Sequence, residues 1–203
     1  MIFQPITIET LKAGSVSEQL KMHCLRNHQE VEKSIIGLIK NSSSVADYIR
    51  LLHIFYGFFS ALENQIQPFI GPDLLPDISF RRKSDLLKAD IISLGAKYSE
   101  DLSHVSLPEI DNPMKAFGAL YVMEGSTLGG VHIAAMLEKK LEIPQHSLRF
   151  FRGYGSQTAS MWENFRTVLN GLPENEQHVC EIMTAADQTF NKFSEWISYR
   201  AVH

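Results

Sequence analysis

The sequence predicts an all-α fold, a single-domain bundle of helices. Long segments carry apolar residues at three- and four-residue spacing, and strict alternation of apolar and polar residues is rare. Proline and glycine separate these segments. The chain has 203 residues, 44% of them hydrophobic, which is enough for one substantial core. We therefore expect residues 1–203 to form one domain, in which residues 1–15 are compatible with a loose N-terminal arm.

The expected helices follow one another with short connections. They span roughly 16–40, with a break somewhere before Asn41, then 44–68, 80–98, 113–142, 156–171 and 174–199. The stretches 69–79 and 99–112 are rich in Pro, Asp and Ser and are expected to be linkers.

Capping residues support three of these boundaries. The run Asn41-Ser-Ser-Ser offers N-cap residues to the second helix, and Asp111-Asn-Pro113 places a proline in the first turn of the fourth. Glu174 and Glu176 lie where the last helix begins, close to the positive end of its dipole. The limits at these three places are therefore expected to be sharp.

Charge and cysteine content narrow the possible partners. The formal net charge is -4, so the chain lacks the basic field that nucleic acid or an anionic membrane favours. Only Cys24 and Cys180 are present, which suits a reducing compartment. The run MIFQPITIETLKAG lacks the pattern of a secretion signal, and no stretch approaches about 20 apolar residues. We expect a soluble, cytoplasmic protein that binds neither nucleic acid nor membrane.

His28 is the strongest candidate for a metal ligand. Taking it as zero on a helical wheel, Lys21 lies about 20° away, and Cys24 and Glu32 lie about 40° to either side. His23 lies about 140° round, so only one of the two histidines can share a site with Lys21. A metal-bound imidazole needs a hydrogen-bond acceptor for its second nitrogen, and Glu32 is one turn away. A solvated His–Glu pair on a surface helix is the alternative interpretation.

The helix expected over 113–142 contains four interior glycines, and each costs about 0.5–1 kcal/mol relative to alanine. Gly118, Gly125 and Gly129 lie within about 20° of a common line, and Gly130 is displaced to the side. Such a stripe lets a large planar molecule approach the helix axis, and it equally suits close packing of another helix. The residues alone leave both interpretations open.

Four segments together resemble one protein family. The run GALYVMEGSTLGG, residues 118–130, resembles the distal-helix signature of heme oxygenases, most closely the biliverdin-producing bacterial type found beside bacteriophytochromes. Residues 20–32, LKMHCLRNHQEVE, are similar to the proximal helix of that family. Residues 51–63 resemble its second long helix, and residues 150–166 resemble the connection and helix beyond the distal one. The segments occur in family order, and the likeness covers roughly residues 18–199.

The resemblance implies a helical bundle of the heme oxygenase type, with heme sandwiched between a proximal and a distal helix. It implies His28 as the iron ligand and Glu32 as its hydrogen-bond acceptor, with Lys21 and Arg166 at the heme propionates. It also places Gly125 and Gly129 against the heme face and the iron-bound oxygen, with Gly130 completing the flexible, heme-binding glycine pair.

Two positions depart from the commoner family pattern. Ser126 stands where many members have an aspartate that anchors the proton-donating water network, although the bacterial subgroup also reads GSTLGG here. A serine hydroxyl can bind water but anchors it less strongly than a carboxylate. Cys24 stands where threonine is commoner, and we interpret it as a small packing residue near the heme rather than as a thiolate ligand.

The resemblance implies that heme is both cofactor and substrate. The expected activity is O2- and reductant-dependent cleavage of heme to biliverdin, carbon monoxide and ferrous iron, in which Gly125, Ser126 and Gly129 form the catalytic surface. The implied partners are a ferredoxin-like or other reductase electron donor and a bacteriophytochrome as a candidate user of biliverdin. We expect a monomer or a weak dimer.

Three other functions compete with this prediction. Ser126 motivates a heme-binding or heme-sensing protein of the same fold without turnover. An oxidase with two irons would need two inward Glu-x-x-His motifs, and the nearest pairs, Glu142–His146 and Glu174–His178, have the wrong spacing. A plain helical interaction module would use the glycine stripe for packing alone.

Overall fold

The computed structural model describes residues 14–98 and 105–202, and all regular structure within these ranges is helical. The helices are α1 (Val16–His23), α2 (Leu25–Asn41), α3 (Val45–Ile66), α4 (Asp85–Ser93), α5 (Pro113–Leu141), α6 (Arg149–Arg152), α7 (Thr158–Gly171) and α8 (Glu176–Val202). Short 3-10 turns occupy η2 (Ile78–Phe80), η3 (Gln145–Ser147) and η4 (Gly155–Gln157). The all-α prediction is confirmed. Most of the expected N-terminal arm and part of the expected linker 99–112 lie outside the described residues.

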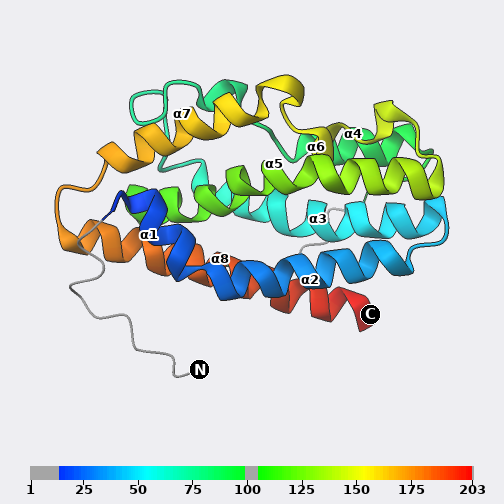
Figure 1. Cartoon of the computed structure of the whole chain (residues 1–203), viewed down its shortest axis with the longest axis horizontal. Helices are drawn as coiled ribbons and strands as arrows, with labels where there is room; N and C mark the ends of the chain where they lie inside the picture. The colour runs from blue at the N-terminus through cyan, green and yellow to red at the C-terminus, as the bar shows by residue number, and fades with distance from the viewer. Residues whose placement is uncertain (1–13, 99–104, 203) are drawn as a thin grey trace.

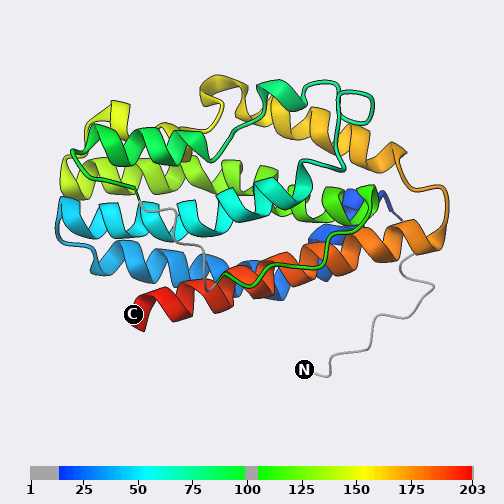
Figure 2. The same cartoon turned by 180° about the vertical axis from the view of Figure 1, so that it is seen from behind.

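The long helices α2, α3, α5 and α8 run roughly along the long axis of the molecule, as Figures 1 and 2 show from opposite sides. The shorter helices α4, α6 and α7 cover one side of this group. The most extensive contact between two helices joins α5 to α8, and α2 contacts both of them. The two helices that the sequence singled out, α2 and α5, are therefore neighbours.

Local capping explains where the long helices begin and end. Ser44 Oγ accepts a hydrogen bond from the backbone nitrogen of Asp47 at 3.2 Å and so caps α3. Asn112 Oδ1 accepts one from the backbone nitrogen of Lys115 at 3.0 Å, with a proline in the first turn of α5. Glu142 then ends α5 in the left-handed conformation, at φ 53°. The expected limits of these two helices are confirmed to within two residues.

The fold differs from the expectation around residues 80–98. Only Asp85–Ser93 is α-helical, and Gly95, which adopts φ 76°, stops the helix at its C-terminal end. At the other end, Arg81 and Arg82 turn into the interior instead of continuing a surface helix. The short helix α6 and the 3-10 turns were not predicted, since segments of three or four residues carry too little periodicity to detect.

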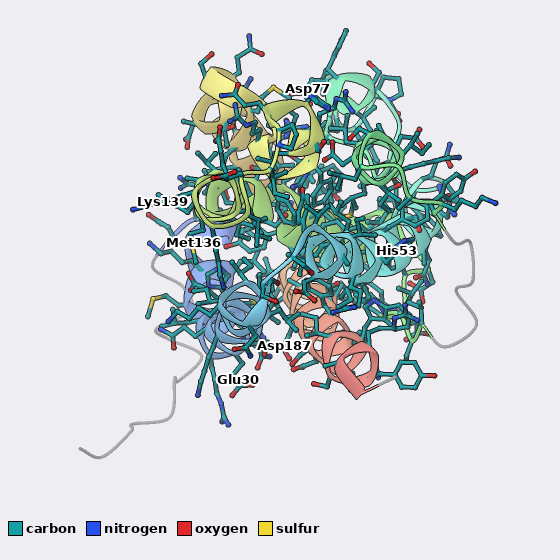
Figure 3. All side chains as sticks on the ribbon, turned by 90° about the vertical axis from the view of Figure 1, so that its right-hand side faces the viewer. Glu30, His53, Asp77, Met136, Lys139 and Asp187 are labelled. Atoms are coloured by element: carbon teal, nitrogen blue, oxygen red, sulfur yellow. The ribbon has the colours of Figure 1, made fainter. Side chains whose placement is uncertain are left out.

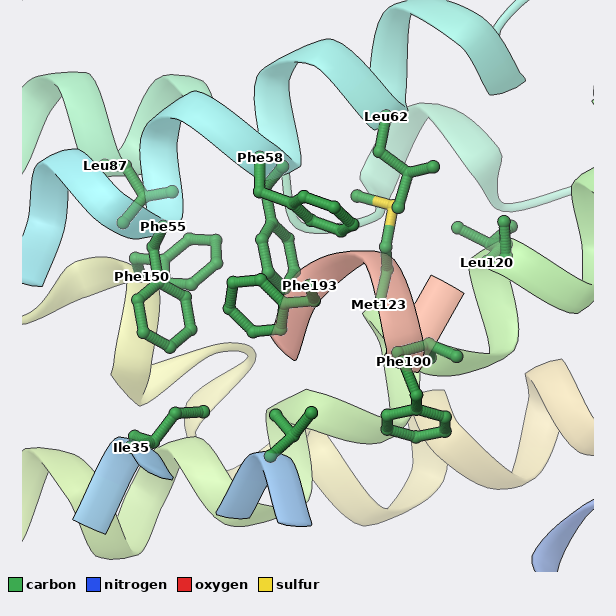
Figure 4. Close-up of a cluster of buried hydrophobic side chains, with 14 of the residues drawn as sticks. Ile35, Phe55, Phe58, Leu62, Leu87, Leu120, Met123, Phe150, Phe190 and Phe193 are labelled. Carbon is green, nitrogen blue, oxygen red and sulfur yellow. The ribbon is translucent and has the colours of Figure 1, made fainter. Parts of the chain in front are cut away.

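An aromatic cluster fixes the centre of the bundle, as Figure 4 shows. Phe58 of α3 lies 4.8 Å from Phe193 of α8, measured between ring centroids, and Phe59 meets Phe150 of α6 edge to face at 5.4 Å. Such ring pairs add about 0.5–1.5 kcal/mol each beyond the area they bury. They join α3, α6 and α8 into one core, against which the site helices are positioned.

Helix α3 is the one described helix that is long and apolar enough to cross a bilayer. In its most apolar window, 61% of the residues are buried inside the bundle. Because most of these residues are buried, α3 is a core helix of the bundle.

Candidate functional site

The first helical segment is kinked one turn before His28. Cys24 separates α1 from α2 with φ -86° and ψ 1°. Helical hydrogen bonding nevertheless continues across it, because its nitrogen donates to Leu20 O and its carbonyl accepts from the nitrogen of His28, both at 2.9 Å. The kink therefore redirects the axis without releasing the chain, and His28 lies in the first turn of α2.

The imidazole of His28 is exposed and is held on one side only. Its ring meets Phe190 of α8 edge to face, with 5.7 Å between centroids and an interplanar angle of 87°. Next to it, Asn27 Nδ2 donates to Asp187 Oδ1 at 2.5 Å, and Figure 3 shows Asp187 between α2 and α8. The turn that carries His28 is thus fixed to the core while its ring is left accessible to a ligand.

Glu32 lies one turn beyond His28, as expected, and is exposed. Within residues 14–98 and 105–202, no hydrogen bond joins the two side chains. Both side chains reach solvent, where nothing forces them together. The role of Glu32 as the acceptor for a metal-bound imidazole remains a prediction.

Two of the four α5 glycines serve helix packing. A Cβ at Gly118 would stand 2.2 Å from the backbone oxygen of Ile182 in α8, so α5 and α8 can approach only with glycine there. A Cβ at Gly130 would stand 2.5 Å from the backbone oxygen of Phe151 in α6. The missing side chain of Gly130 therefore makes room for α6, and the role of Gly130 in heme binding stays a prediction.

The other two glycines have space beside them. A Cβ at Gly129 would meet nothing within 4 Å, and one at Gly125 would meet only the ring of Trp162, at 3.5 Å. On α5, the exposed apolar side chain of Met136 shares a helix face with Gly129, two turns further on. Met136 lies on the outer side of α5 in Figure 3. The glycine stripe is therefore a packing surface at Gly118 and an open, apolar surface around Gly129.

Ser126 faces a buried arginine rather than free solvent. Its Oγ accepts a hydrogen bond from Arg82 Nη2 and donates one to Met123 O, both at 2.6 Å. Arg82 also lies over the ring of Phe150 at 4.1 Å. The single hydroxyl hydrogen of Ser126 is thus already used, and only acceptor capacity remains. Arg82 is thus part of the polar surroundings of Ser126. It was not among the predicted site residues, because the run Arg81-Arg82-Lys83 is typical of an exposed basic segment.

A buried polar network continues behind Ser126. Arg81 forms ion pairs with Glu124 at 2.7 Å and Asp77 at 2.8 Å, and the first of these is almost fully buried. The hydroxyl of Tyr154 donates to Glu124 at 2.9 Å and accepts from the nitrogen of Arg82 at 2.8 Å. A cavity of about 340 Å³ lined partly by this network lies between α3, the segment before α4, and α5. Its lining is mixed, and the charged groups of Arg81, Arg82 and Glu124 on one side can bind water.

The two predicted cations lie at neighbouring helices. Arg166 of α7 donates from Nε to Ser17 Oγ of α1 at 3.1 Å and pairs with Glu163 at 3.1 Å. Lys21 is exposed on α1, one turn after Ser17. Helices α1 and α7 contact each other at one end of the bundle, as Figure 1 shows. The structure therefore brings the expected propionate partners to one region.

Cys24 is buried, with 2% of its surface exposed. Burial, with a smaller contribution from the charge of Asp187, raises the pKa of its thiol to about 12. Tyr121, on α5, has its pKa raised to about 12 by burial and by the nearby Cys24. A thiol that stays protonated cannot act as a thiolate ligand, which agrees with the interpretation of Cys24 as a packing residue.

The raised thiol pKa has a consequence for stability. The unfolded chain releases the Cys24 proton near pH 8.5, whereas the folded chain retains it up to about 12. This contribution to stability is present below pH 8.5 and is lost as the pH rises from there towards 12. Urea unfolding at pH 8 and pH 10.5 should therefore show a larger loss of stability for the wild type than for Cys24→Ala. Equal losses in the two proteins would contradict the buried, protonated thiol.

The described residues bring no group of three or more His, Cys, Asp or Glu side chains into a metal-binding cluster. The alternative with two irons therefore has no ligand set among them. An exposed imidazole on α2, and an open backbone surface on the contacting helix α5, instead suit a flat ligand that already holds its own metal. The fold and the residues of α2 and α5 are those of a helical heme protein.

Comparison with known proteins gives the family. The heme oxygenase family model matches residues 14–199, and the chain belongs to the heme oxygenase family. It is 28% identical to heme oxygenase PigA of Pseudomonas aeruginosa over 192 residues, which cover 92% of this chain and 93% of that protein. It is 24% identical to a heme oxygenase of Xanthomonas campestris pv. campestris over 154 residues, which cover 76% of this chain and 90% of that protein.

A solved structure shows the same fold. The NO- and CO-bound heme oxygenase from Neisseria meningitidis has a TM-score of 0.77 and 19% identity, and the match covers 93% of this chain and 92% of that one. The prediction of a bacterial heme oxygenase, a heme-degrading enzyme with heme as its ligand, is confirmed by these comparisons. The more specific subgroup found beside bacteriophytochromes stays a prediction.

Proposed function

We propose that heme lies between the imidazole of His28 and the backbone of α5 at Gly125 and Gly129, where it is opened to biliverdin with release of carbon monoxide and ferrous iron. The observation that carries this proposal is the difference among the glycines of α5. Gly125 and Gly129, which the resemblance places against the heme face, are the two that have open or nearly open space beside them. His28 is exposed on α2, a helix in contact with α5. The donor set also fits, since an imidazole can hold heme iron, apolar walls suit the macrocycle, and cations pair with its carboxylates.

Each proposed contact has a chemical task. When bound, heme supplies the iron that activates O2 and is itself the molecule that is oxidised. His28 binds on one side and leaves the other side free, and Gly125 and Gly129 hold the ring close to backbone that carries no side chain. Lys21 and Arg166 pair with the propionates, for which the planar fork of arginine is well suited.

Proton supply is the task of the polar side of α5. Ser126 can accept a hydrogen bond from water, while Arg82 holds its hydroxyl in place. Beyond Arg82, the side chains of Tyr154 and Glu124 continue the hydrogen-bonded network, and Glu124 lines the cavity between α3 and α5. We propose that this network replaces the carboxylate anchor that an aspartate at position 126 would provide.

The proposed reaction also needs partners other than heme. The reaction requires O2 and an external electron donor, for which a ferredoxin-like protein or another reductase is suitable. We propose a cytoplasmic monomer or weak dimer, with a bacteriophytochrome as a candidate user of the biliverdin. The occupied hydroxyl of Ser126 favours one second candidate, a protein of the same fold that binds heme without turning it over.

One experiment separates these candidates. Hemin is added to the pure protein, the absorption spectrum is recorded, and ascorbate or reduced ferredoxin is then supplied in air. We expect a histidine-ligated spectrum followed by loss of the heme band and formation of biliverdin. A heme complex whose heme band persists after reductant and oxygen are added would support the non-catalytic candidate. Failure to bind hemin at micromolar concentration would contradict both.

A further inference from the structure

Trp162 of α7 forms an aromatic wall beside the open glycines. Its six-membered ring faces Gly125, with Cη2 at 3.5 Å and Cζ3 at 3.8 Å from the position of a Cβ there. The indole is stacked on Phe165 at 5.8 Å and tilted against Tyr121 at 5.3 Å between centroids. Contacts on two sides hold the ring in one orientation.

The wall marks where the open part of the glycine stripe ends. Gly129 has nothing beside it, Gly125 has the indole, and Gly118 is closed by the backbone of α8. From Gly118 to Gly129 the helix rises by about 16 Å, so the surroundings change from closed to open within three turns. A flat molecule resting on Gly129 therefore meets the indole of Trp162 when it extends along α5 towards Gly125.

The same helix also carries a predicted propionate partner. Arg166 lies one turn beyond Trp162, and positions four apart share one face of a helix. Arg166 is in turn bonded to Ser17 of α1, the helix that carries Lys21. One side of α7 thus offers a rigid apolar wall and a cation in adjacent positions.

We propose that Trp162 is a specificity-determining residue that sets how the heme is rotated within its own plane, and thereby which meso carbon is attacked. The proposal rests on the proposed function. Charges bring the propionates to Lys21 and Arg166, but a charge pair alone tolerates a range of rotations, because the exposed side chain of Lys21 is flexible and a carboxylate can be approached from several directions. A rigid indole against the macrocycle edge distinguishes rotations by shape, since the methyl and vinyl groups around that edge differ.

The test uses the ferric hemin complex with cyanide, whose NMR spectrum reports in-plane orientation through its heme methyl resonances. Trp162→Leu removes the flat ring, Trp162→Phe retains one, and Phe80→Leu removes an aromatic ring that is 79% exposed. We expect a second set of methyl resonances in Trp162→Leu, and about a five-fold rise in the ratio of minor to major biliverdin isomers. Trp162→Phe and Phe80→Leu should retain the wild-type pattern.

A measurement on the wild type makes the test independent of whether the leucine variant folds. The cyanide complex should show nuclear Overhauser contacts between indole protons of Trp162 and protons at the heme edge. Absence of these contacts would overturn the proposal, as would an unchanged methyl pattern and isomer ratio in Trp162→Leu. Wild-type protein that binds no hemin would instead refute the proposed function, and this inference with it.

Discussion

Replacement of His28 by alanine is expected to abolish the histidine-ligated heme spectrum and to lower the rate of biliverdin formation by more than about 100-fold, since even the outer partners of metal ligands are worth about 10–100-fold. The side chain is exposed, so the variant should fold normally. Its loss removes the imidazole that holds the iron from the α2 side. Absorption spectroscopy of the hemin complex and a turnover assay with ascorbate in air measure both effects.

The matched control is His23→Ala. His23 is also exposed, but it lies in the last turn of α1, on the other side of the kink at Cys24. That variant should keep the wild-type spectrum and turnover. Added imidazole should partly restore the spectrum of His28→Ala, because it can occupy the space left by the deleted ring. Full activity of His28→Ala without imidazole would remove the ligand assignment.

Bulky substitutions in the glycine stripe should separate binding from folding. Gly129→Leu introduces a side chain into open space, so the fold should remain intact and helix propensity should favour the variant by about 0.8 kcal/mol. The leucine would occupy the surface on which we place the heme. We expect hemin affinity to fall at least about tenfold, or about 1.4 kcal/mol, measured by titration.

Gly118→Ala is the counterpart on the same stripe. Its Cβ would stand 2.2 Å from the backbone of α8, so α5 and α8 must separate. Overpacking of this kind costs about 1–3 kcal/mol, which lowers Tm by about 2–4 °C for each kcal/mol in a chain of this size. Thermal unfolding followed by circular dichroism measures the loss. Tight hemin binding by Gly129→Leu, or unchanged Tm in Gly118→Ala, would contradict the division of the stripe into an open part and a packed part.

The predictable part of the fold is the part with long-range periodicity and strong caps. Helix α5 was predicted within one residue because Asn112 and Pro113 mark its start and its apolar pattern continues for eight turns. The segment 80–98 was overextended, since Arg81 and Arg82 look like surface residues until Glu124 and Ser126 are brought next to them. Partners more than 40 positions away leave no local signal in the sequence.

The candidate site, too, could be predicted from the sequence only in part. The helical wheel identified which histidine can share a face with Lys21, and the family resemblance assigned the glycines. Only the structure distinguishes Gly130, which makes room for α6, from Gly129, beside which no described atom lies within 4 Å of a Cβ position. Trp162 lies 37 positions from Gly125, and spacing along one helix cannot show which neighbouring helix its ring meets.

The most direct test of the central claim is a crystal structure of the hemin complex. The account predicts iron bound to an imidazole nitrogen of His28, with the opposite face of the ring against the backbone of Gly125 and Gly129. The propionates should lie beside Lys21 and Arg166. Iron held by any other side chain, or a ring placed away from the glycines of α5, would contradict the account.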